Sequence, residues 1–380
     1  MRIAIATETF LPATDGICTR FANMAVEMKR MGHEVIIISP DLGITEYQGI
    51  PVYGMETFNF ALYGSRPWGK PNKAIKKILK EFKPDVVHAV NPFIMVTSAV
   101  HYAKKLDIPL LTSYHTHIPN YLDHYHLPLL KPLLWEYLRF WHQGSDINLT
   151  VSASLAQELE EQAIDVHGVM PRGIDLSQRD PEFFDQDLYQ ELTFGLPDQK
   201  LLVYVGRLAA EKDIDQLRAI FNYRHDICLA IVGDGPEKEN LERLFAGTKT
   251  TFVGFKFGQE LAKAFATADA FIFPSTSETF GLVISEAMAS GLPVIAAESG
   301  PTLEQIQPLK TGVCFESHNE ASLIEALDCL DQPLLMQAMG LQARSEAQKY
   351  SWQAAASCLV DYYEQAINHH FGQENNCSNL

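Results

Sequence analysis

The sequence lacks the long apolar runs that membrane-spanning helices require. Such a helix needs roughly 18 consecutive apolar residues, and the nearest candidate, residues 86–100, is interrupted by His88, Asn91 and Pro92. The first segment, MRIAIATETF, reaches Glu8 before it can form the apolar core of a signal peptide. We therefore predict a cytoplasmic protein without a spanning helix.

Clustered cysteines and an excess of positive charge are also missing. The six cysteines form no CxxC motif and no close group, so we expect reduced thiols rather than a disulfide framework. The net charge of −17 weighs against binding to nucleic acid. The acidity is uneven, because residues 1–176 hold 16 Lys and Arg against 18 Asp and Glu, whereas the remaining residues hold 14 against 29.

Short apolar runs that alternate with amphipathic stretches indicate an α/β fold, since buried parallel strands are almost continuously apolar. Two series of such runs occur, at 3–7, 35–39, 85–90, 108–114 and 147–151, and at 201–206, 228–235, 251–254, 270–275 and 292–297. A polar, acidic stretch at 175–200 separates the two series. We predict two Rossmann-like doubly wound domains facing across a cleft, at 1–176 and 177–350, followed by a helix and tail at 351–380.

Two cations follow the first predicted strand of the second domain, in VGRLAAEKD. Arg207 comes directly after Gly206, and Lys212 lies five residues later. A guanidinium can bind two phosphate oxygens at once while an ammonium acts as a point charge. The pair therefore suits a diphosphate. The alternative is a solvated loop with ion pairs to Glu211 and Asp213.

The next glycine-containing strand end is VGDGP, at 232–236. Pro236 suits the first position of a helix. Asp234 would either hold the ribose or base of a nucleotide or cap that helix, and the sequence alone favours capping.

The stretch SETFGLVISEAM, at 277–288, places two carboxylates around a predicted helix that runs from 280 to 290. Glu278 lies outside the helix end, where it could accept bonds from sugar hydroxyls, and Glu286 lies about two turns in, where it could bind a ribose diol. The alternatives are that Glu278 is merely a neighbour of the N-cap and that Glu286 is a surface residue. Backbone amides at a helix start bind phosphate, and those expected here belong to Thr279, Phe280, Gly281 and Leu282.

In the first domain, Asp15-Gly16 precedes a predicted helix. The backbone amides around 16–18 would lie at the positive end of that helix, which can bind an anion. A single Gly before a helix is also common in ordinary turns.

Histidines gather in TSYHTHIPNYLDHYH, at 112–126. His115 and His117 are expected on one side of a strand, and together with His124 and His126 they raise the alternative of zinc. No Cys or paired carboxylate completes that ligand set. The favoured interpretation puts His115 at the carboxyl end of the strand, donating to a substrate hydroxyl or carbonyl. Tyr114 and His117 beside it are candidates for the acceptor side.

A basic face and an aromatic stretch are candidates for contact with lipid. In KPNKAIKKILKEFKP, at 70–84, apolar residues occupy one face of a predicted helix. The other face fits an ordinary surface or attachment to anionic lipid, and it carries Lys73, Lys76, Lys77, Lys80 and Lys83. The stretch LLKPLLWEYLRFW, at 129–141, is either a lipid-facing wall or a core helix.

Together these motifs resemble the retaining family-four glycosyltransferases of GT-B fold, and the resemblance runs over essentially the whole chain. Its combination of Glu278, seven residues and Glu286 with the Arg207 and Lys212 pair is more specific than any single motif. More narrowly, TETFLPATDGICTR, TSYHTHIPNYL, YVGRLAAEKDID and DGPEKENLERLFAG are similar to the sulfoquinovosyltransferases of cyanobacteria and plastids.

The resemblance implies transfer of sulfoquinovose from UDP-sulfoquinovose to diacylglycerol, at the surface of a thylakoid or inner membrane. Arg207 and Lys212 would hold the diphosphate, Glu286 the ribose, and Glu278 and His115 the transferred sugar. It also implies that no metal is needed and that the last helix crosses back to the first domain.

One departure affects the identity of the sugar. The family usually has Gly-Gly and an acidic residue after the strand at 292–297, whereas ESGPTLEQ here has Pro301 in place of the second Gly. Glucosyl- or mannosyltransferases acting on another lipid are therefore the alternative. A nucleotide-sugar epimerase and a sensor without catalytic activity are more remote alternatives.

Overall fold

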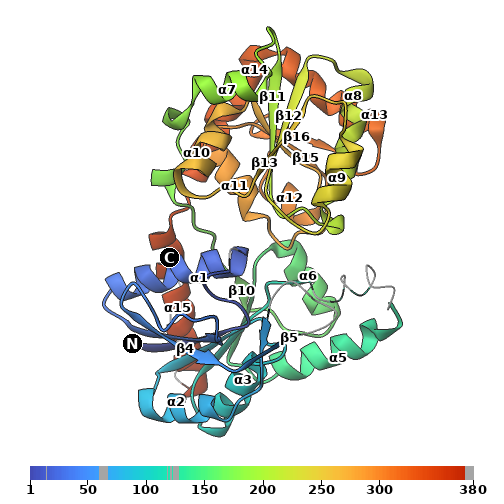
Figure 1. Cartoon of the computed structure of the whole chain (residues 1–380). Helices are drawn as coiled ribbons and strands as arrows, with labels where there is room; N and C mark the ends of the chain where they lie inside the picture. The colour runs from blue at the N-terminus through green and yellow to red at the C-terminus, as the bar shows by residue number, and fades with distance from the viewer. Residues whose placement is uncertain (14, 60–66, 118, 120–121, 123–127, 373–380) are drawn as a thin grey trace. The chain divides into compact units, whose positions relative to one another are not determined.

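The computed structural model describes residues 1–13, 15–59, 67–117, 119, 122 and 128–372. It divides into two compact units, one formed by Met1–Gly173 with Trp352–Leu380 and the other by Ile174–Ser351. Each unit has a mainly parallel sheet with helices packed on it, and each has its own apolar core (Figure 1).

The sheet of the first unit has the order β10-β9-β8-β7-β1-β2-β4-β3, with every pair parallel except β3 and β4. Its strands are β1 (Arg2–Thr7), β2 (Glu34–Pro40), β3 (Glu46–Tyr47), β4 (Ile50–Met55), β7 (Val86–Val90), β8 (Leu110–Ser113), β9 (Ile147–Thr150) and β10 (Gly168–Val169). A separate hairpin pairs β5 (Thr57–Asn59) with β6 (Pro67–Gly69). Because β1 lies between β2 and β7, the strand order reverses at β1, and such a switch point is where doubly wound sheets bind ligands.

The described helices of the first unit are α1 (Gly16–Arg30), α2 (Ala74–Phe82), α3 (Val96–Lys105), η1 (Pro128–Leu130), α5 (Lys131–His142), α6 (Ala153–Glu161) and α15 (Trp352–His370). Although α15 ends the described chain, it packs beside α1 in this unit (Figure 1). Leu359 and Tyr363 of α15 are completely buried in the core formed with β1, β7 and α1. Residues of β1 and α1 therefore share one apolar core with residues of α15.

The sheet of the second unit is entirely parallel, in the order β13-β12-β11-β14-β15-β16. Its strands are β11 (Lys200–Val205), β12 (Ile227–Val232), β13 (Thr250–Gly254), β14 (Ala270–Phe273), β15 (Val294–Ala297) and β16 (Gly312–Phe315). Here the order reverses between β11 and β14. The segments that follow these two strands therefore start side by side.

The helices of the second unit cover both faces of this sheet, as parallel strands buried on both faces require (Figure 1). They are η2 (Leu176–Gln178), η3 (Pro181–Phe183), α7 (Gln186–Leu192), η4 (Ala210–Lys212), η5 (Ile214–Ala219), α8 (Ile220–Tyr223), α9 (Lys238–Leu244), α10 (Gly258–Thr267), α11 (Leu282–Ala289), α12 (Gly300–Leu303), α13 (Glu320–Leu327), η6 (Asp328–Asp331) and α14 (Pro333–Ala347).

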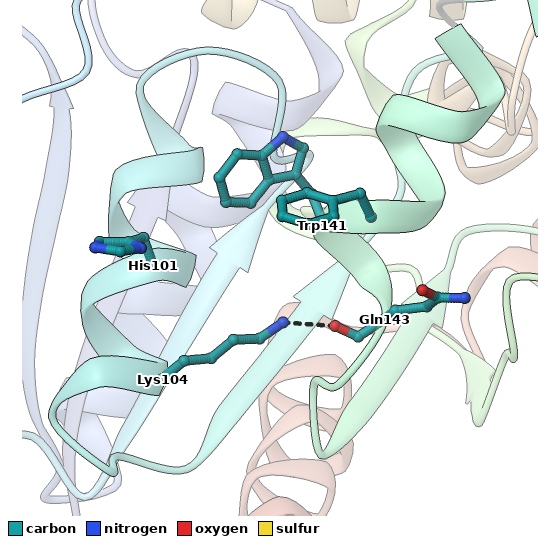
Figure 2. Close-up of a pocket in the computed structure, with 5 residues that line it drawn as sticks. His101, Lys104, Trp141 and Gln143 are labelled. Atoms are coloured by element: carbon teal, nitrogen blue, oxygen red, sulfur yellow. Dashed lines mark hydrogen bonds between the residues drawn. The ribbon is translucent and has the colours of Figure 1, made fainter. Parts of the chain in front are cut away.

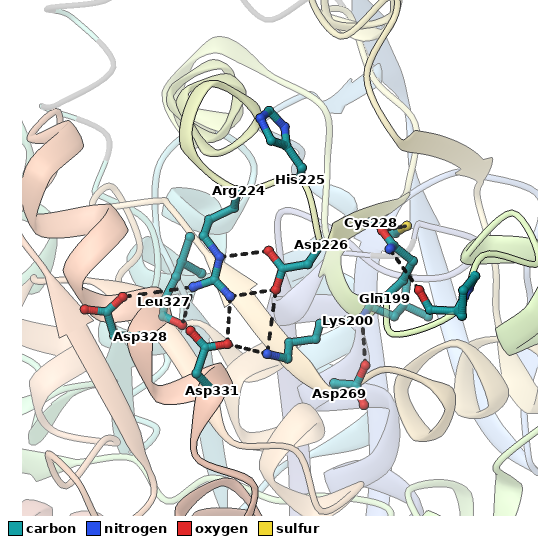
Figure 3. A network of polar contacts seen from close by, with 12 residues as sticks. Gln199, Lys200, Arg224, His225, Asp226, Cys228, Asp269, Leu327, Asp328 and Asp331 are labelled. Carbon is teal, nitrogen blue, oxygen red and sulfur yellow. Dashed lines mark hydrogen bonds and ion pairs between the residues drawn. The ribbon is translucent and has the colours of Figure 1, made fainter.

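An ion-pair network lies at the amino-terminal ends of β11 and β12 (Figure 3). Arg224 contacts Asp226 at 2.7 Å and Asp331 at 2.9 Å, and Lys200 pairs with both carboxylates. The guanidinium of Arg224 lowers the pKa of Asp226 to about 2. The network joins η6 to the strands at the end of the sheet opposite the loops that follow β11 and β14.

The two-domain α/β prediction is confirmed, and every predicted strand is present, with one or both of its ends at a different residue. The prediction that helix α11 starts at Phe280 is wrong: it starts at Leu282, because Gly281 before it is left-handed, with φ of 78°. No helix in the described part of the chain is long and apolar enough to span a bilayer.

Candidate functional site

The loops after β11 and β14 bring two predicted residues into contact. Lys212 ends η4, which follows β11, and Glu278 lies between β14 and α11. Lys212 Nζ is 2.5 Å from Glu278 Oε1, and the two side chains are 14% and 24% exposed. The structure thus places a largely buried ion pair at the switch point of the second unit.

Arg207 lies in the same loop but pairs with Glu211, as the alternative interpretation of this motif expected. Its side chain is 44% exposed, so it is accessible to a ligand. The Ser277 hydroxyl donates to the backbone oxygen of Glu211 at 2.6 Å. This bond ties the loop after β11 to the loop after β14.

Glycines let the loops after β11 and β12 touch. A Cβ at Gly233 would lie 1.9 Å from the backbone oxygen of Gly206, and a Cβ at Gly235 would lie 2.2 Å from that of Leu208. Gly233 also has φ of 147°, which side chains rarely adopt. Gly206 and its neighbours are therefore fixed by backbone contact.

The prediction that Asp234 caps the following helix is wrong. Helix α9 begins at Lys238 with Glu237 as N-cap and has no side-chain cap. Asp234 is exposed and accepts a bond from the amide of Gly235 at 2.8 Å. Its carboxylate stays on the surface of the loop, available to solvent or to a ligand.

Two residues that the sequence analysis missed support α11. Arg179 directly follows η2, and its Nη2 is 3.1 Å from Glu286 Oε1. The two side chains are 9% and 29% exposed. Gln305 is buried, donates to the backbone oxygen of Phe280 and accepts from Ser285 at 2.7 Å. Glu286 is therefore a partly buried, ion-paired carboxylate, and the alternative of a simple surface residue is wrong.

The predicted anion site at the start of α1 is filled by the chain itself, so this prediction is corrected. Asp15 is the N-cap, and its Oδ1 accepts from the amides of Ile17 at 3.1 Å and Cys18 at 2.9 Å. Thr9 donates to the other oxygen at 2.6 Å. Gly16, the first helical residue, lies in a helix end where these two amides already bind a carboxylate.

Glu8 makes a second such contact that the sequence did not suggest. Its carboxylate is buried and accepts from four amides at the start of α3, those of Phe93, Ile94, Met95 and Val96, at 2.7 to 3.3 Å. Burial raises the pKa of Glu8, while these four bonds oppose the rise. Glu8 thereby links the loop after β1 to the loop after β7.

His115 lies just after β8 and is 5% exposed. Its Nε2 is 2.8 Å from Ser113 Oγ, and its backbone amide donates to Asn91 Oδ1 at 3.1 Å. Burial, together with the nearby charge of Arg20, holds the pKa of His115 well below its usual value. The ring is therefore a neutral imidazole.

The prediction that His115 and His117 share one side of a strand is wrong, because β8 ends at Ser113. His117 instead contacts Glu158 of α6 at 2.6 Å. Tyr114 is completely buried, with its ring stacked on Trp135. The side chain of Tyr114 therefore presents no surface to an acceptor.

Among the described residues, no group of three or more His, Cys, Asp or Glu side chains could hold a metal. His124 and His126 lie outside the described residues.

A cavity of about 290 Å³ lies between α3 and α5 (Figure 2). Its lining includes His101, Lys104 and Trp141, and Lys104 Nζ donates to the backbone oxygen of Gln143 at 2.5 Å. Phe140 and Trp141 of this lining belong to the stretch 129–141, which was predicted as either a lipid-facing wall or a core helix, whereas the other lining residues were not predicted to belong to a site.

Comparison with known families identifies both halves of the chain. Residues 14–178 match the model described as Glycosyltransferase Family 4, and residues 193–345 match the one described as Glycosyl transferases group 1. The chain is 35% identical to a sulfoquinovosyl transferase of Arabidopsis thaliana, over 93% of this chain and 71% of that protein. The chain belongs to the family-four glycosyltransferases. As the sequence resemblance implied, this glycosyltransferase is a retaining hexosyltransferase.

Other relatives of this glycosyltransferase act on different sugars. A GDP-mannose-dependent α-mannosyltransferase of Mycobacterium tuberculosis is 31% identical over 96% of each chain. An α-monoglucosyldiacylglycerol synthase of Streptococcus pneumoniae is 29% identical over 78% of this chain and 71% of that one.

Solved structures establish the fold as GT-B. A sucrose-phosphate synthase from Thermosynechococcus elongatus matches with a TM-score of 0.78 and 20% identity, over 96% of this chain and 98% of that one. Anabaena HepE, solved in complex with UDP and glucose, matches with a TM-score of 0.76 and 17% identity, over 96% and 99%. At these identities the likeness concerns the fold alone.

Proposed function

We propose that this glycosyltransferase moves sulfoquinovose from UDP-sulfoquinovose to diacylglycerol and so makes a sulfolipid. The observation that carries the proposal is the 35% identity to the Arabidopsis sulfoquinovosyl transferase over 93% of the chain. The glucosyldiacylglycerol synthase among the relatives supports a lipid acceptor.

The donor diphosphate is assigned to the loop after β11. Arg207 is accessible and can take two phosphate oxygens, while Lys212 supplies a point charge. In the absence of a ligand both cations are neutralised by Glu211 and Glu278. A diphosphate would replace these carboxylates as their partner.

The remaining donor groups are assigned to the loop after β14 and to α11. Glu286, held by Arg179, is suited to accept hydrogen bonds from ribose hydroxyls, because an ionised carboxylate only accepts. Glu278 and His115 would bind hydroxyls of the transferred sugar. The amides of Thr279, Phe280, Gly281 and Leu282 would face phosphate, while Gly206 and Asp234 would line the nucleotide side.

For the reaction we propose that the bond between the sugar C1 and the diphosphate oxygen breaks and that the acceptor oxygen bonds to C1 from the same face. The acceptor's proton passes to the departing phosphate oxygen. Arg207 and Lys212 stabilise the negative charge that develops on that phosphate. This scheme uses no protein nucleophile, and we propose that it needs no metal.

Membrane contact is assigned to α2 and α5. On α2, Ile75 and Leu79 are buried, whereas the opposite face is basic. On α5, Trp135 faces the core, whereas Leu133 and Phe140 are 70% and 64% exposed. A basic helix and an exposed apolar one within the first unit suit a peripheral contact with an anionic membrane. The buried Tyr114 and the His117 that contacts Glu158 are left out of this surface.

The test is a product assay. The purified enzyme is incubated with UDP-sulfoquinovose or UDP-glucose, with and without diacylglycerol vesicles, and UDP release and labelled lipid are measured. We expect release that depends on both UDP-sulfoquinovose and diacylglycerol. Acceptor-dependent release with UDP-glucose alone would contradict the proposed donor.

A glucosyl- or mannosyltransferase acting on another lipid is the second candidate. It is favoured by the mannosyltransferase relatives that match over 96% of the chain and by Pro301, which stands at the start of α12. GDP-mannose therefore belongs in the same assay. Product that forms only from GDP-mannose would favour this candidate, and a product released as free sugar nucleotide would indicate an epimerase.

A further inference from the structure

Four buried side chains form a continuous hydrogen-bonded chain in the first unit. Tyr363 Oη of α15 is 2.8 Å from His88 Nδ1 of β7, His88 Nε2 is 2.7 Å from Ser113 Oγ of β8, and the same oxygen is 2.8 Å from His115 Nε2. Three of these side chains are completely buried and His115 is 5% exposed. His115 is thus connected to the last helix through two intervening groups.

Both imidazoles in this chain are neutral at physiological pH. Burial lowers the pKa of His88 to about 3, and it holds that of His115 well below its usual value. Each neutral ring has one N–H donor and one acceptor nitrogen. Phe21 contacts both rings edge-on, with centroid separations of 5.1 and 5.4 Å, which limits their rotation.

The Tyr363 hydroxyl, at one end of this hydrogen-bonded series, determines which atom of each group carries the proton. Within the described part of the protein, the hydroxyl of Tyr363 has His88 as its hydrogen-bond partner, and that of Ser113 has the two rings. If His88 donated to Tyr363, the buried phenol proton would lack an acceptor, at a cost of about 1–3 kcal/mol. The favoured order therefore has Tyr363 donating to His88 Nδ1, His88 Nε2–H donating to Ser113, and Ser113 donating to His115 Nε2.

We propose that Tyr363, His88 and Ser113 are positioning residues that fix His115 as the tautomer with its proton on Nδ1. His115 then acts as a hydrogen-bond donor through Nδ1, and its Nε2 is already engaged and takes no proton from the acceptor. This assignment of roles rests on the proposed function, whereas the tautomer is a property of the protein alone. The residues that position His115 would then include Tyr363, which is 248 positions away in the sequence.

The first experiment reads the tautomers directly, without substrate. Protein labelled with ¹⁵N in histidine is studied by long-range ¹H–¹⁵N correlation, and the two rings are assigned with His88→Gln and His115→Gln. We expect His115 protonated on Nδ1 and His88 on Nε2. A His115 ring protonated on Nε2 would overturn the proposal, whatever the outcome of the transfer assay.

The second experiment uses Tyr363→Phe, which keeps the buried ring and removes the hydroxyl. The expected results are a mixture of His115 tautomers and a kcat about tenfold lower, as for the loss of one neutral hydrogen bond, with little change in KM for the nucleotide sugar. Tyr362→Phe, on the same helix and only partly buried, is the matched control and should change neither.

Ser113→Ala removes the central link by a small change and serves as a second variant if Tyr363→Phe folds poorly. It should release His115 from the fixed tautomer while His88 keeps its own. An unchanged His115 spectrum and an unchanged kcat in both variants would refute the proposal. If the spectrum of His115 changes but the wild-type protein transfers no sugar, the proposed function is refuted and the assignment of the His115 tautomer is retained.

Discussion

At the scale of single residues, the contact between Lys212 and Glu278 is central. It joins the segments after β11 and β14, and both side chains are largely buried. Under the proposed function Lys212 would bind the donor diphosphate, and a cation already held in place would need little reorganisation to do so. Glu278 compensates the charge of Lys212 in the structure described.

Replacing Lys212 with Ala should lower kcat by about 10²-fold, the usual effect of removing one group that stabilises transition-state charge. The measurement is the rate of UDP release at saturating donor. Lys238→Ala, which removes a lysine from α9 in the same unit, should leave the rate close to wild type. Equal rates for the two variants would refute the role of Lys212.

Glu8→Gln should destabilise the first unit by about 2 kcal/mol. The amide of Gln offers one acceptor oxygen, so some of the four backbone N–H groups that now bind the carboxylate would be buried without a partner. Denaturant unfolding measures the change. Glu46→Gln, at an exposed position, is the control. A stability equal to wild type would show that these four bonds contribute little.

The sequence allowed prediction of the residues that directly follow buried strands, because strand ends of a doubly wound sheet meet at its switch point. Arg207, Lys212 and Glu278 were singled out in this way, and the structure places them in the loops after β11 and β14. Arg179 and Gln305 were not found, because each acts through a contact with a distant part of the chain, and no local pattern signals such a contact.

At the scale of elements, α2 combines a buried apolar face with a basic one. Lys73, Lys77 and Lys80 are exposed, and Lys76 is partly exposed. Each basic residue near an anionic membrane surface contributes about 1 kcal/mol to binding. This face is therefore the part of the first unit that we expect to respond most to membrane charge.

Changing Lys76, Lys77 and Lys80 to Glu should reduce co-sedimentation with anionic vesicles strongly, and added salt should weaken wild-type binding in the same way. A matched variant with the same change of charge replaces the exposed Lys105, Lys310 and Lys349. If both triple variants lose binding equally, net charge rather than α2 is responsible, and the assignment to α2 is refuted.

The network around Arg224 predicts a pH dependence of stability. The pKa of Asp226 is lowered from 3.8 to about 2 by Arg224, and Lys200 lowers that of Asp331. A carboxyl whose pKa is depressed by folding stabilises the fold above its unfolded pKa, and this stability is lost as pH falls through the folded value.

We therefore expect the free energy of unfolding of the second unit to fall between about pH 4 and pH 2. Asp226→Asn should lower stability at neutral pH and flatten the dependence in this window, as followed by denaturant titrations at several pH values. Asp215→Asn, at an exposed site of the same unit, should keep the wild-type slope. Because Asp226 is 37% exposed, solvent weakens the effect.

Element boundaries were harder to predict than elements. Strand β16, Gly312–Phe315, was not predicted. The start of α11 was placed two residues early because the left-handed backbone of Gly281 is decided by its surroundings, including the bond from Gln305 to Phe280.

At the scale of the whole molecule, the described residues form three apolar clusters, two in the first unit and one in the second. One cluster of the first unit contains residues from both α1 and α15, whereas that of the second unit is formed by the continuous segment Ile174–Ser351. A change in α15 should therefore affect the first unit, although the helix directly follows the second unit in sequence.

Leu359→Ala tests this division, because Leu359 is completely buried in the core of the first unit. The cavity should destabilise that unit by about 2–5 kcal/mol. Hydrogen exchange followed peptide by peptide should then accelerate in β1, β7 and α1, because local opening reports the stability of each unit. Leu327→Ala, an equally buried leucine in the core of the second unit, is the matched control and should accelerate exchange in β11 and β15 instead. Faster exchange throughout both units in either variant would mean that the two cores unfold together, and it would contradict their independence.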